Sequence, residues 1–196
     1  MEFKETVFKR RMVRNFADRS IDPETIKRIV ELTRHAPSAG FTQGQSFVVV
    51  TKPELRKAIA DTCSEAEYVK AGFDPFISKA PILLIPCTSE AAYHRRYQLP
   101  DKVDKDGKEI EWPVPYWFMD IGCAVMIALL AVIDEGLVSA FVGSKDLKTL
   151  RSLLNIPDEI HPVGVIAVGY RAEDVPSPSL KRGRKPDAEY VHYEGW

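Results

Sequence analysis

The spacing of apolar and polar positions predicts helices along much of the chain. Apolar residues at helical spacing favour a short helix over Phe3–Arg10. Asp22 is a suitable N-cap and Pro23 a suitable first helical residue, so a second helix is expected over residues 23–36, ending at Pro37. Two further helices are expected over residues 53–72 and 146–154.

Short apolar runs predict strands between these helices. Phe47–Val50 and Pro81–Cys87 are rich in branched apolar residues, as strands buried on both faces are. Leu137–Gly143 and Pro162–Tyr170 predict two more strands. Strands alternating with helices indicate a layered α/β or α+β fold, and residues 1–196 suit one domain.

The segment of residues 117–135 is apolar on nearly every side of its predicted helix. A helix of this kind must be covered all round, either by a core or by another subunit. Its apolar run Ile121–Ile133 is flanked by Asp120 and Asp134 and is short for a bilayer span, so we expect a buried helix rather than a membrane anchor.

Two segments are polar and rich in proline. Residues 91–116 carry the tract DKVDKDGKE and form either a lid or insertion or a solvated loop with no role. Residues 171–196 are too polar for a core of their own, and we expect a C-terminal arm that wraps over something else, such as a partner subunit.

Composition narrows the class of protein. The formal net charge of the 196 residues is -1, which suggests neither a nucleic-acid nor a membrane partner. The N-terminus lacks the pattern of a secretory or transit signal, so a cytoplasmic location is expected. The three cysteines and four histidines are scattered, which favours core thiols over a disulfide framework and predicts no metal site.

Two basic clusters are the strongest chemical signal. FKRRMVRNF, from Phe8 to Phe16, holds four cations, and LKRGRK ends at Lys185. Guanidinium forks match phosphate oxygens, so these arginines could converge on one phosphate, although each cluster alone could be a solvated face or a targeting signal. Since nucleotide-binding glycine motifs and nucleophile motifs are absent, an enzyme built on this chain would use a bound organic cofactor.

Five segments in order resemble the nitroreductase family of FMN-dependent oxidoreductases: RRMVRNF, APSAGFTQGQSFVVV, YWFMDIG, GLVSAFVG and GRKPDAEYVHYEGW. The resemblance implies an α+β sandwich with a mostly antiparallel central sheet flanked by helices. It also implies an intertwined homodimer with an extended C-terminal arm and two FMN sites at the interface.

The resemblance also implies the site residues. The family motif RRSxR, which holds the FMN phosphate and ribityl chain, corresponds to Arg10, Arg11, Met12, Val13 and Arg14, and the C-terminal basic pair to Arg182 and Arg184. The loop that meets the flavin of the other subunit corresponds to Pro37, Ser38, Ala39 and Gly40, together with Gln43. Backbone donors near the flavin N5 correspond to Val142 and Gly143, and Phe41, Tyr93 and Tyr116 are candidates for substrate contact.

Two departures from the family pattern define a divergent subgroup. Met12 stands where RRSxR has Ser, which removes a hydroxyl donor. PSAGFTQGQ stands where the family has PSxxNxQPW, so Phe41 replaces the Asn amide that commonly meets the flavin pyrimidine, and only Gln43 persists. These changes bear on the flavin potential and on the substrate class.

The resulting hypothesis is an enzyme with tightly bound FMN in which NAD(P)H is a transient hydride donor. By a ping-pong mechanism it would reduce a small electron-poor acceptor such as a nitroaromatic, quinone or enone. No side chain is a convincing catalytic acid or base. The alternatives are a reductive dehalogenase or flavin-degrading enzyme of the same fold, and a non-catalytic flavin-binding protein.

Overall fold

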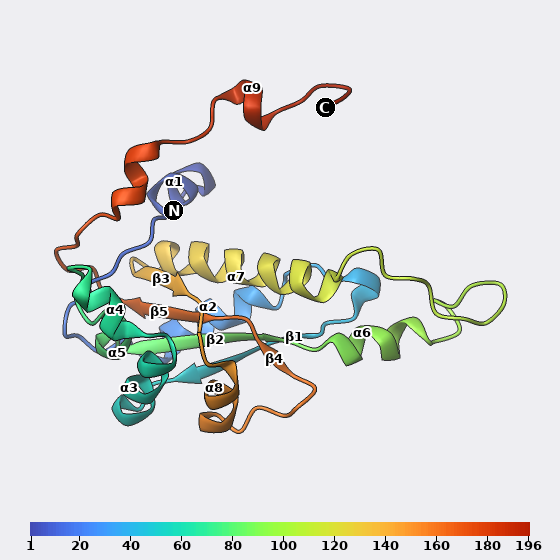
Figure 1. Ribbon diagram of the computed structural model, residues 1–196, viewed down its shortest axis with the longest axis horizontal. Coiled ribbons are helices and arrows are strands. Elements are labelled where there is room, and N and C mark those ends of the chain that lie inside the picture. Colours follow the sequence, from blue (N-terminus) through green and yellow to red (C-terminus); the bar gives the residue numbers. More distant parts are fainter.

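A computed structural model describes all residues 1–196 and shows a central sheet between two helical layers (Figure 1). The strands are β1 (Gln45–Val50), β2 (Ile82–Thr88), β3 (Val138–Val142), β4 (His161–Pro162) and β5 (Val165–Gly169). Their order is β1-β2-β5-β3, with β4 beside β2, and every pair is antiparallel. The prediction of helices around an antiparallel sheet is confirmed.

Two helices cover one face of the sheet, and both match the predicted segments closely. They are α2 (Pro23–Thr33) and α7 (Tyr116–Asp134). The side chain of Asp22 caps α2 by accepting a hydrogen bond from the backbone N–H of Glu24, and Pro23 is the first residue of the helix. Their core includes Ile29, Val132 and the inward residues Ile82 and Leu84 of β2.

The opposite face is covered by α3 (Pro53–Thr62), α5 (Phe76–Lys79) and α8 (Leu147–Leu153), with α4 (Glu65–Lys70) beside them. The prediction that residues 53–72 are helical is confirmed, but as two helices, because Ser64 adopts a left-handed φ of 56° and divides α3 from α4. The carboxylate of Glu65 then caps α5 by accepting from the backbone N–H groups of Ile77 (2.5 Å) and Ser78 (3.0 Å).

The two buried strands that the sequence predicts differ in environment. Every residue of β2 is buried, because helices cover both of its faces and strands flank both of its edges. β1 is instead an edge strand, and Val49 is 40% exposed, so the prediction of burial on both faces is wrong for Phe47–Val50. Composition alone did not separate a central strand from an apolar edge strand.

The long helix α7 has one covered side and one uncovered side. Ala124, Ala128 and Val132 are buried against the sheet. Phe118, Met119 and Met126 are 49%, 55% and 40% exposed, and Gly122 and Cys123 lie between them, so these five positions form one stripe, hereafter the α7 stripe. By length and composition α7 could cross a membrane, but 56% of its apolar window is buried inside the chain, as in a core helix.

Two of the three predicted core thiols are confirmed. Cys63 and Cys87 are buried, and burial raises the pKa of each thiol to about 11. Cys123 is exposed on the α7 stripe, so the prediction of a core thiol is wrong for this residue in the single chain.

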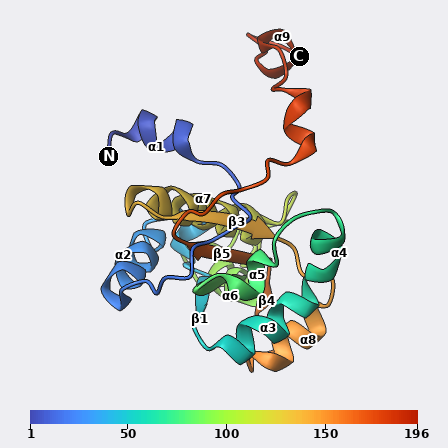
Figure 2. The same cartoon turned by 90° about the vertical axis from the view of Figure 1, so that its left-hand side faces the viewer.

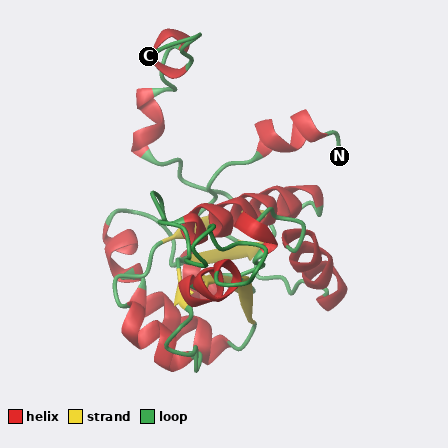
Figure 3. Cartoon of the chain, turned by 90° about the vertical axis from the view of Figure 1, so that its right-hand side faces the viewer, coloured by secondary structure: helices red, strands yellow, loops and turns green.

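Both ends of the chain extend from this body. The N-terminal helix α1 (Phe3–Lys9) is followed by an extended segment, and the last residues form η2 (Pro178–Arg182) and α9 (Asp187–Tyr190). Figures 2 and 3 show α1 and the η2–α9 segment projecting on the same side of the molecule as α7 and diverging from each other. Phe3, Phe8, Tyr190, Tyr193 and Trp196 are exposed on them.

Candidate flavin site

The basic N-terminal segment is fixed between a strand and the start of the C-terminal segment. Val13 donates its backbone N–H to the Ser139 carbonyl of β3 at 3.0 Å, and Met12 forms a parallel bridge with Ser139. On the other side, the backbone N–H of Arg14 donates to Asp174 Oδ1 at 2.9 Å. The segment that carries the candidate phosphate residues is thus part of the folded body, although its neighbour α1 projects from it.

Arginines of both basic clusters lack counterions. Arg10, Arg11, Arg14, Arg182 and Arg184 have no carboxylate within 4.0 Å, whereas Lys9 forms a 2.6 Å ion pair with Glu5 one helical turn away. The side chain of Lys9 is 54% exposed. The arginines of FKRRMVRNF are therefore available to an anion, and Lys9 has a local partner.

Arg14 has the environment of a ligand-binding arginine. Its guanidinium carbon lies 5.2 Å from the centre of the Phe73 ring, and its Nε is buried without a hydrogen-bond partner in the chain. A buried donor without an acceptor is costly, so an acceptor supplied by a bound group would stabilise this arrangement. Phe73, which precedes α5, was not among the residues predicted from the sequence.

Met12 occupies the family's Ser position for a structural reason. Its sulfur accepts the backbone N–H of Phe141 at 3.3 Å, so the side chain packs along β3. Val13 beside it is fully buried. The side chains of Met12 and Val13 therefore attach the segment to the body. Their backbone groups and the flanking arginines remain available for contact with a cofactor.

The turn after β3 is open where the family places backbone donors. Val142 is buried, whereas Gly143 is exposed, and no atom lies within 4 Å of a Cβ added to it. The next two residues are hydrogen-bonded to the body of the chain: Ser144 Oγ (3.2 Å) and the backbone N–H of Lys145 (2.8 Å) both donate to the Thr62 carbonyl. The turn therefore presents Gly143 on a fixed base with space around it.

The second basic cluster does not meet the first within one chain. Arg182 ends η2 and Arg184 follows it, both exposed on the projecting C-terminal segment. In Figure 2, η2 and α1 project on the same side of the body as α7 but diverge from each other, and no hydrogen bond or ion pair joins the two basic clusters in the single chain.

The loop Pro37–Gln45 has an unusual backbone. Gly40, Phe41 and Gln43 have left-handed φ values of 60°, 54° and 55°, and such values are costly for the latter two because they carry a Cβ. A Cβ on Gly40 would lie 2.8 Å from the Tyr97 ring, so this position requires glycine for both conformation and space. In this loop Phe41 is 76% exposed.

Other residues hold this loop in place. Within the loop, the backbone N–H of Gln43 donates to Ser38 Oγ at 2.9 Å, and Gln45 Nε2 donates to the Pro37 carbonyl at 2.9 Å. From α6 (Glu90–Tyr97), Arg96 Nε donates to the Gly40 carbonyl at 2.9 Å.

The buried carboxylate of Asp120 joins the loop to two helices. Asp120 lies in α7, and its Oδ2 accepts from the backbone N–H of Ala39 at 2.8 Å and from the Tyr93 hydroxyl of α6 at 2.7 Å. Asp120 and Arg96 were both missed as functional candidates, although a charge at the start of an apolar helix is a signal that could have identified Asp120.

Tyr93 requires a correction. Its side chain is fully buried and its hydroxyl is bound to Asp120, so in the single chain it positions the loop and offers no exposed surface for the predicted substrate contact. Burial, reinforced by the hydrogen bond to Asp120, raises the pKa of the Tyr93 hydroxyl well above its ordinary value. Tyr116, at the start of α7, remains partly exposed.

The segment predicted as a lid or solvated loop is partly helical and packs on the body. It begins with α6 and continues as an irregular segment over residues 98–115. Trp112 anchors this segment, with its ring centre 4.5 Å from that of Tyr97 and 6.0 Å from that of Tyr116. Arg96 adds a two-point ion pair with Asp101.

A charged cluster joins the irregular segment to α6. His94 Nδ1 lies 2.6 Å from Glu109 Oε1, and the same oxygen accepts from Trp112 Nε1 at 2.6 Å. The hydrogen bond with Glu109 raises the pKa of His94 above its ordinary value, against the smaller opposing effect of burial. Burial raises the pKa of Glu109, but hydrogen bonds from Trp112, His94 and Gln98 together outweigh it and lower that pKa.

Comparison with known proteins identifies the family. The sequence profile of the nitroreductase family matches residues 7–170, which include the basic segment, the loop, α7 and the whole sheet. The chain belongs to the nitroreductase family. The predicted family and fold are confirmed, and so is the class of NAD(P)H-dependent oxidoreductase to which such a chain belongs.

The relatives have several names. A provisionally named NADH dehydrogenase/NAD(P)H nitroreductase of Archaeoglobus fulgidus is 26% identical over 194 residues, covering 97% of this chain and 96% of that protein. An iodotyrosine deiodinase of Haliscomenobacter hydrossis is 27% identical, with 97% and 89% covered. A nitroreductase family protein of Clostridium difficile has the same fold, with a TM-score of 0.72, 24% identity and complete coverage of both chains.

The Asp120 contacts generate a stability prediction. In Asp120→Ala the buried Ala39 N–H and Tyr93 hydroxyl both lose their acceptor, which we expect to lower the free energy of unfolding by roughly 2–4 kcal/mol. Tyr93→Phe removes only one of the two bonds and should cost about 1 kcal/mol. Urea unfolding of the two variants measures this. Equal losses in both variants would contradict the assignment of Asp120 as the shared acceptor.

The His94–Glu109 pair predicts a pH dependence of the contact between α6 and the irregular segment over residues 98–115. Because the folded pKa of His94 is raised, its contribution is complete below the ordinary value of 6.5 and is lost as the pH rises through the raised value. Because the pKa of Glu109 is lowered, its contribution is lost only as the pH falls below 4.5. We expect the indole N–H resonance of Trp112 to shift with a midpoint above 6.5.

The matched control for this titration is the exposed His35. His94→Gln should abolish the shift of the Trp112 resonance, and His35→Gln should leave it in place. A midpoint at or below 6.5 in the unaltered protein would show that the ion pair does not hold the segment.

Proposed function

We propose that the chain is an FMN-dependent oxidoreductase that uses NAD(P)H to reduce a small electron-poor acceptor. The observation that carries the proposal is Arg14, whose Nε is buried without an acceptor in the segment where the family binds the FMN phosphate. Arg10 and Arg11 beside it are free of carboxylates, and Gly143 offers open backbone nearby in the fold. These residues fit the predicted cofactor.

Each group of residues has a role in this proposal. Arg10, Arg11 and Arg14 bind the phosphate and ribityl oxygens through charge-assisted hydrogen bonds, and Arg182 and Arg184 complete the phosphate site. FMN, when bound, supplies the transfer of a hydride from NAD(P)H to the acceptor. The backbone N–H at Gly143 would stabilise negative charge that develops near the flavin N5. The chain needs no side-chain acid or base for this role.

A homodimer is part of the same proposal. The α7 stripe is an apolar surface that the single chain leaves exposed, and exposed aromatics extend it onto both termini. A second copy would cover these surfaces through a twofold interface, in which the same patch faces itself. It would also bring the Pro37–Gln45 loop of one subunit toward the basic segment of the other, as the family resemblance implies.

Reductive dehalogenation is the second candidate. It is favoured by relatives named iodotyrosine deiodinase, including one from Nematostella vectensis that is 27% identical over 204 residues. The segment over residues 98–115, with Trp112 packed edge-on against Tyr97 of α6, would serve as the substrate lid. Turnover of iodotyrosine but not of nitroaromatics or quinones by the reduced protein would favour this candidate.

The primary test is spectroscopic. We expect the purified protein to show a flavin absorption spectrum that NADH or NADPH bleaches without oxygen and that an electron-poor acceptor restores. A protein that is colourless and takes up no FMN would overturn both candidates. Bound flavin that neither nicotinamide bleaches would indicate a non-catalytic flavin-binding protein.

The phosphate assignment predicts a loss of affinity. Replacing Arg10 and Arg184 together with Ala should weaken FMN binding by at least roughly 100-fold, because each charge-assisted contact contributes on the order of 1.5–3 kcal/mol. Lys9→Ala is the matched control, since Lys9 pairs with Glu5, and it should bind FMN normally. Quenching of flavin fluorescence measures the affinities. Unchanged affinity in the double variant would show that the phosphate lies elsewhere.

The dimer assignment predicts a loss of self-association. Met119→Glu with Met126→Glu places two charges on the α7 stripe, and we expect monomers in sedimentation experiments together with a loss of bound FMN. Leu147→Glu, at a residue of α8 that is exposed to a similar degree, should leave the oligomeric state unchanged. A monomeric parent protein that retains FMN would contradict the shared site.

A further inference from the structure

A cavity lies outside the candidate flavin site. Its volume is about 830 Å³, within the range of small-molecule sites. Its walls come from the segment Asn15–Ile21, from α2 and α3, and from the chain that joins α5 to β2. None of the residues assigned to FMN lines it, although Asn15 follows Arg14 directly.

Cations outnumber carboxylates on the cavity walls. Arg19, Arg56 and Lys79 line the cavity, against a single carboxylate, Asp18. Arg19 and Arg56 have no carboxylate within 4.0 Å. Like charges gathered in a concave surface concentrate the field, so the cavity attracts anions.

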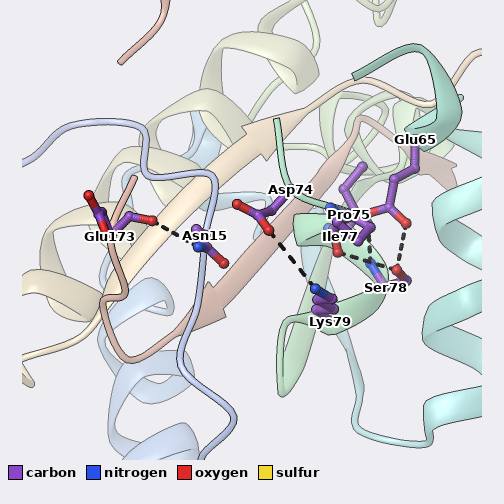
Figure 4. A network of polar contacts seen from close by, with 8 residues as sticks. All are labelled: Asn15, Glu65, Asp74, Pro75, Ile77, Ser78, Lys79 and Glu173. Atoms are coloured by element: carbon purple, nitrogen blue, oxygen red, sulfur yellow. Dashed lines mark hydrogen bonds and ion pairs between the residues drawn. The ribbon is translucent and has the colours of Figure 1, made fainter. Parts of the chain in front are cut away.

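Lys79 is only loosely paired. Its Nζ lies 3.9 Å from Asp74 Oδ1, the longest ion pair in the chain. Figure 4 shows this contact beside Ser78, whose hydroxyl is turned to Glu65 at 2.5 Å. An anionic ligand could therefore replace Asp74 as the ion-pair partner of Lys79 at little cost in free energy, because an exposed ion pair contributes little to stability.

The two arginines are held by contacts other than ion pairs. The Arg19 guanidinium lies 3.8 Å from the centre of the Tyr170 ring. Arg56 Nη1 donates to the Ala80 carbonyl, and its Nε is buried without a partner. Guanidinium groups fixed in this way keep their planar forks oriented, and such forks match the oxygens of phosphate or carboxylate.

The remaining walls are of mixed character. Ile21, Ile26 and Ile82 supply an apolar surface, and Ser20 and Thr51 supply hydroxyl groups. This combination suits a ligand with a compact apolar body and one anionic group. From the charge excess, the fixed guanidinium groups and the apolar wall, we propose that the cavity binds a small organic anion of this kind, a phosphate ester or a carboxylate.

Calorimetric titration of the FMN-saturated full-length protein tests the proposal. The probes are phenyl phosphate and benzoate, which share an apolar ring and differ in the anion. We expect saturable binding of at least one, weakened by added salt because the attraction is ionic. Tighter binding of phenyl phosphate would assign a phosphate ligand, and tighter binding of benzoate a carboxylate. No saturable binding of either at millimolar concentrations would overturn the proposal.

Variants locate the binding. Arg19→Gln with Lys79→Gln should weaken binding at least tenfold and leave the flavin spectrum unchanged. The matched control is Arg95→Gln, at an exposed arginine paired with Glu159 away from the cavity walls. Ser20→Glu, which adds a carboxylate at an exposed position of the wall, should weaken binding independently. Binding that none of the cavity variants alters would place the anion elsewhere and overturn the proposal.

Discussion

The contact between α7 and the sheet is the interaction on which the rest of the structure depends. The buried side of α7 packs against β2 and β5 and forms, with α2, the core on one face of the sheet. The same helix is apolar on its opposite side, where the α7 stripe is exposed. In a single chain, therefore, one apolar side of this helix is covered and the other is exposed. The proposed dimer would cover the exposed side.

The candidate flavin site is incomplete for the same reason. Within one chain, the basic segment is bound to β3 and the turn at Gly143 is open, but Arg182 and Arg184 are exposed on the C-terminal segment, which projects from the body. The loop over residues 37–45 is fixed to α6 and α7 through Arg96 and Asp120, and no hydrogen bond or ion pair joins it to the basic segment. In the proposed dimer, the twofold axis would bring this loop of one subunit toward the basic segment of the other.

The sequence predicted elements whose signals are local, and it failed where distant contacts decide. The Asp22 cap and Pro23 located α2 because capping depends on a few adjacent residues. The break at Ser64 was missed because Glu65 is needed to cap α5, a contact between elements. Burial of Tyr93 was missed because its partner Asp120 lies in another helix. The family resemblance supplied the arginines of the candidate site, but not Phe73 or Arg96.

Met12 shows how a departure from a family pattern can be compensated by the fold. A Ser at this position would have a hydroxyl to offer a ligand, whereas the Met sulfur accepts the Phe141 N–H and secures the segment to β3. Sulfur is a weak acceptor, so this contact acts mainly through packing. Arg14 keeps its unpartnered Nε beside this fixed segment. With Met12 in place of Ser, this side chain attaches the segment to β3 instead of offering a hydroxyl to a ligand. Binding of the phosphate would therefore depend more heavily on the guanidinium groups.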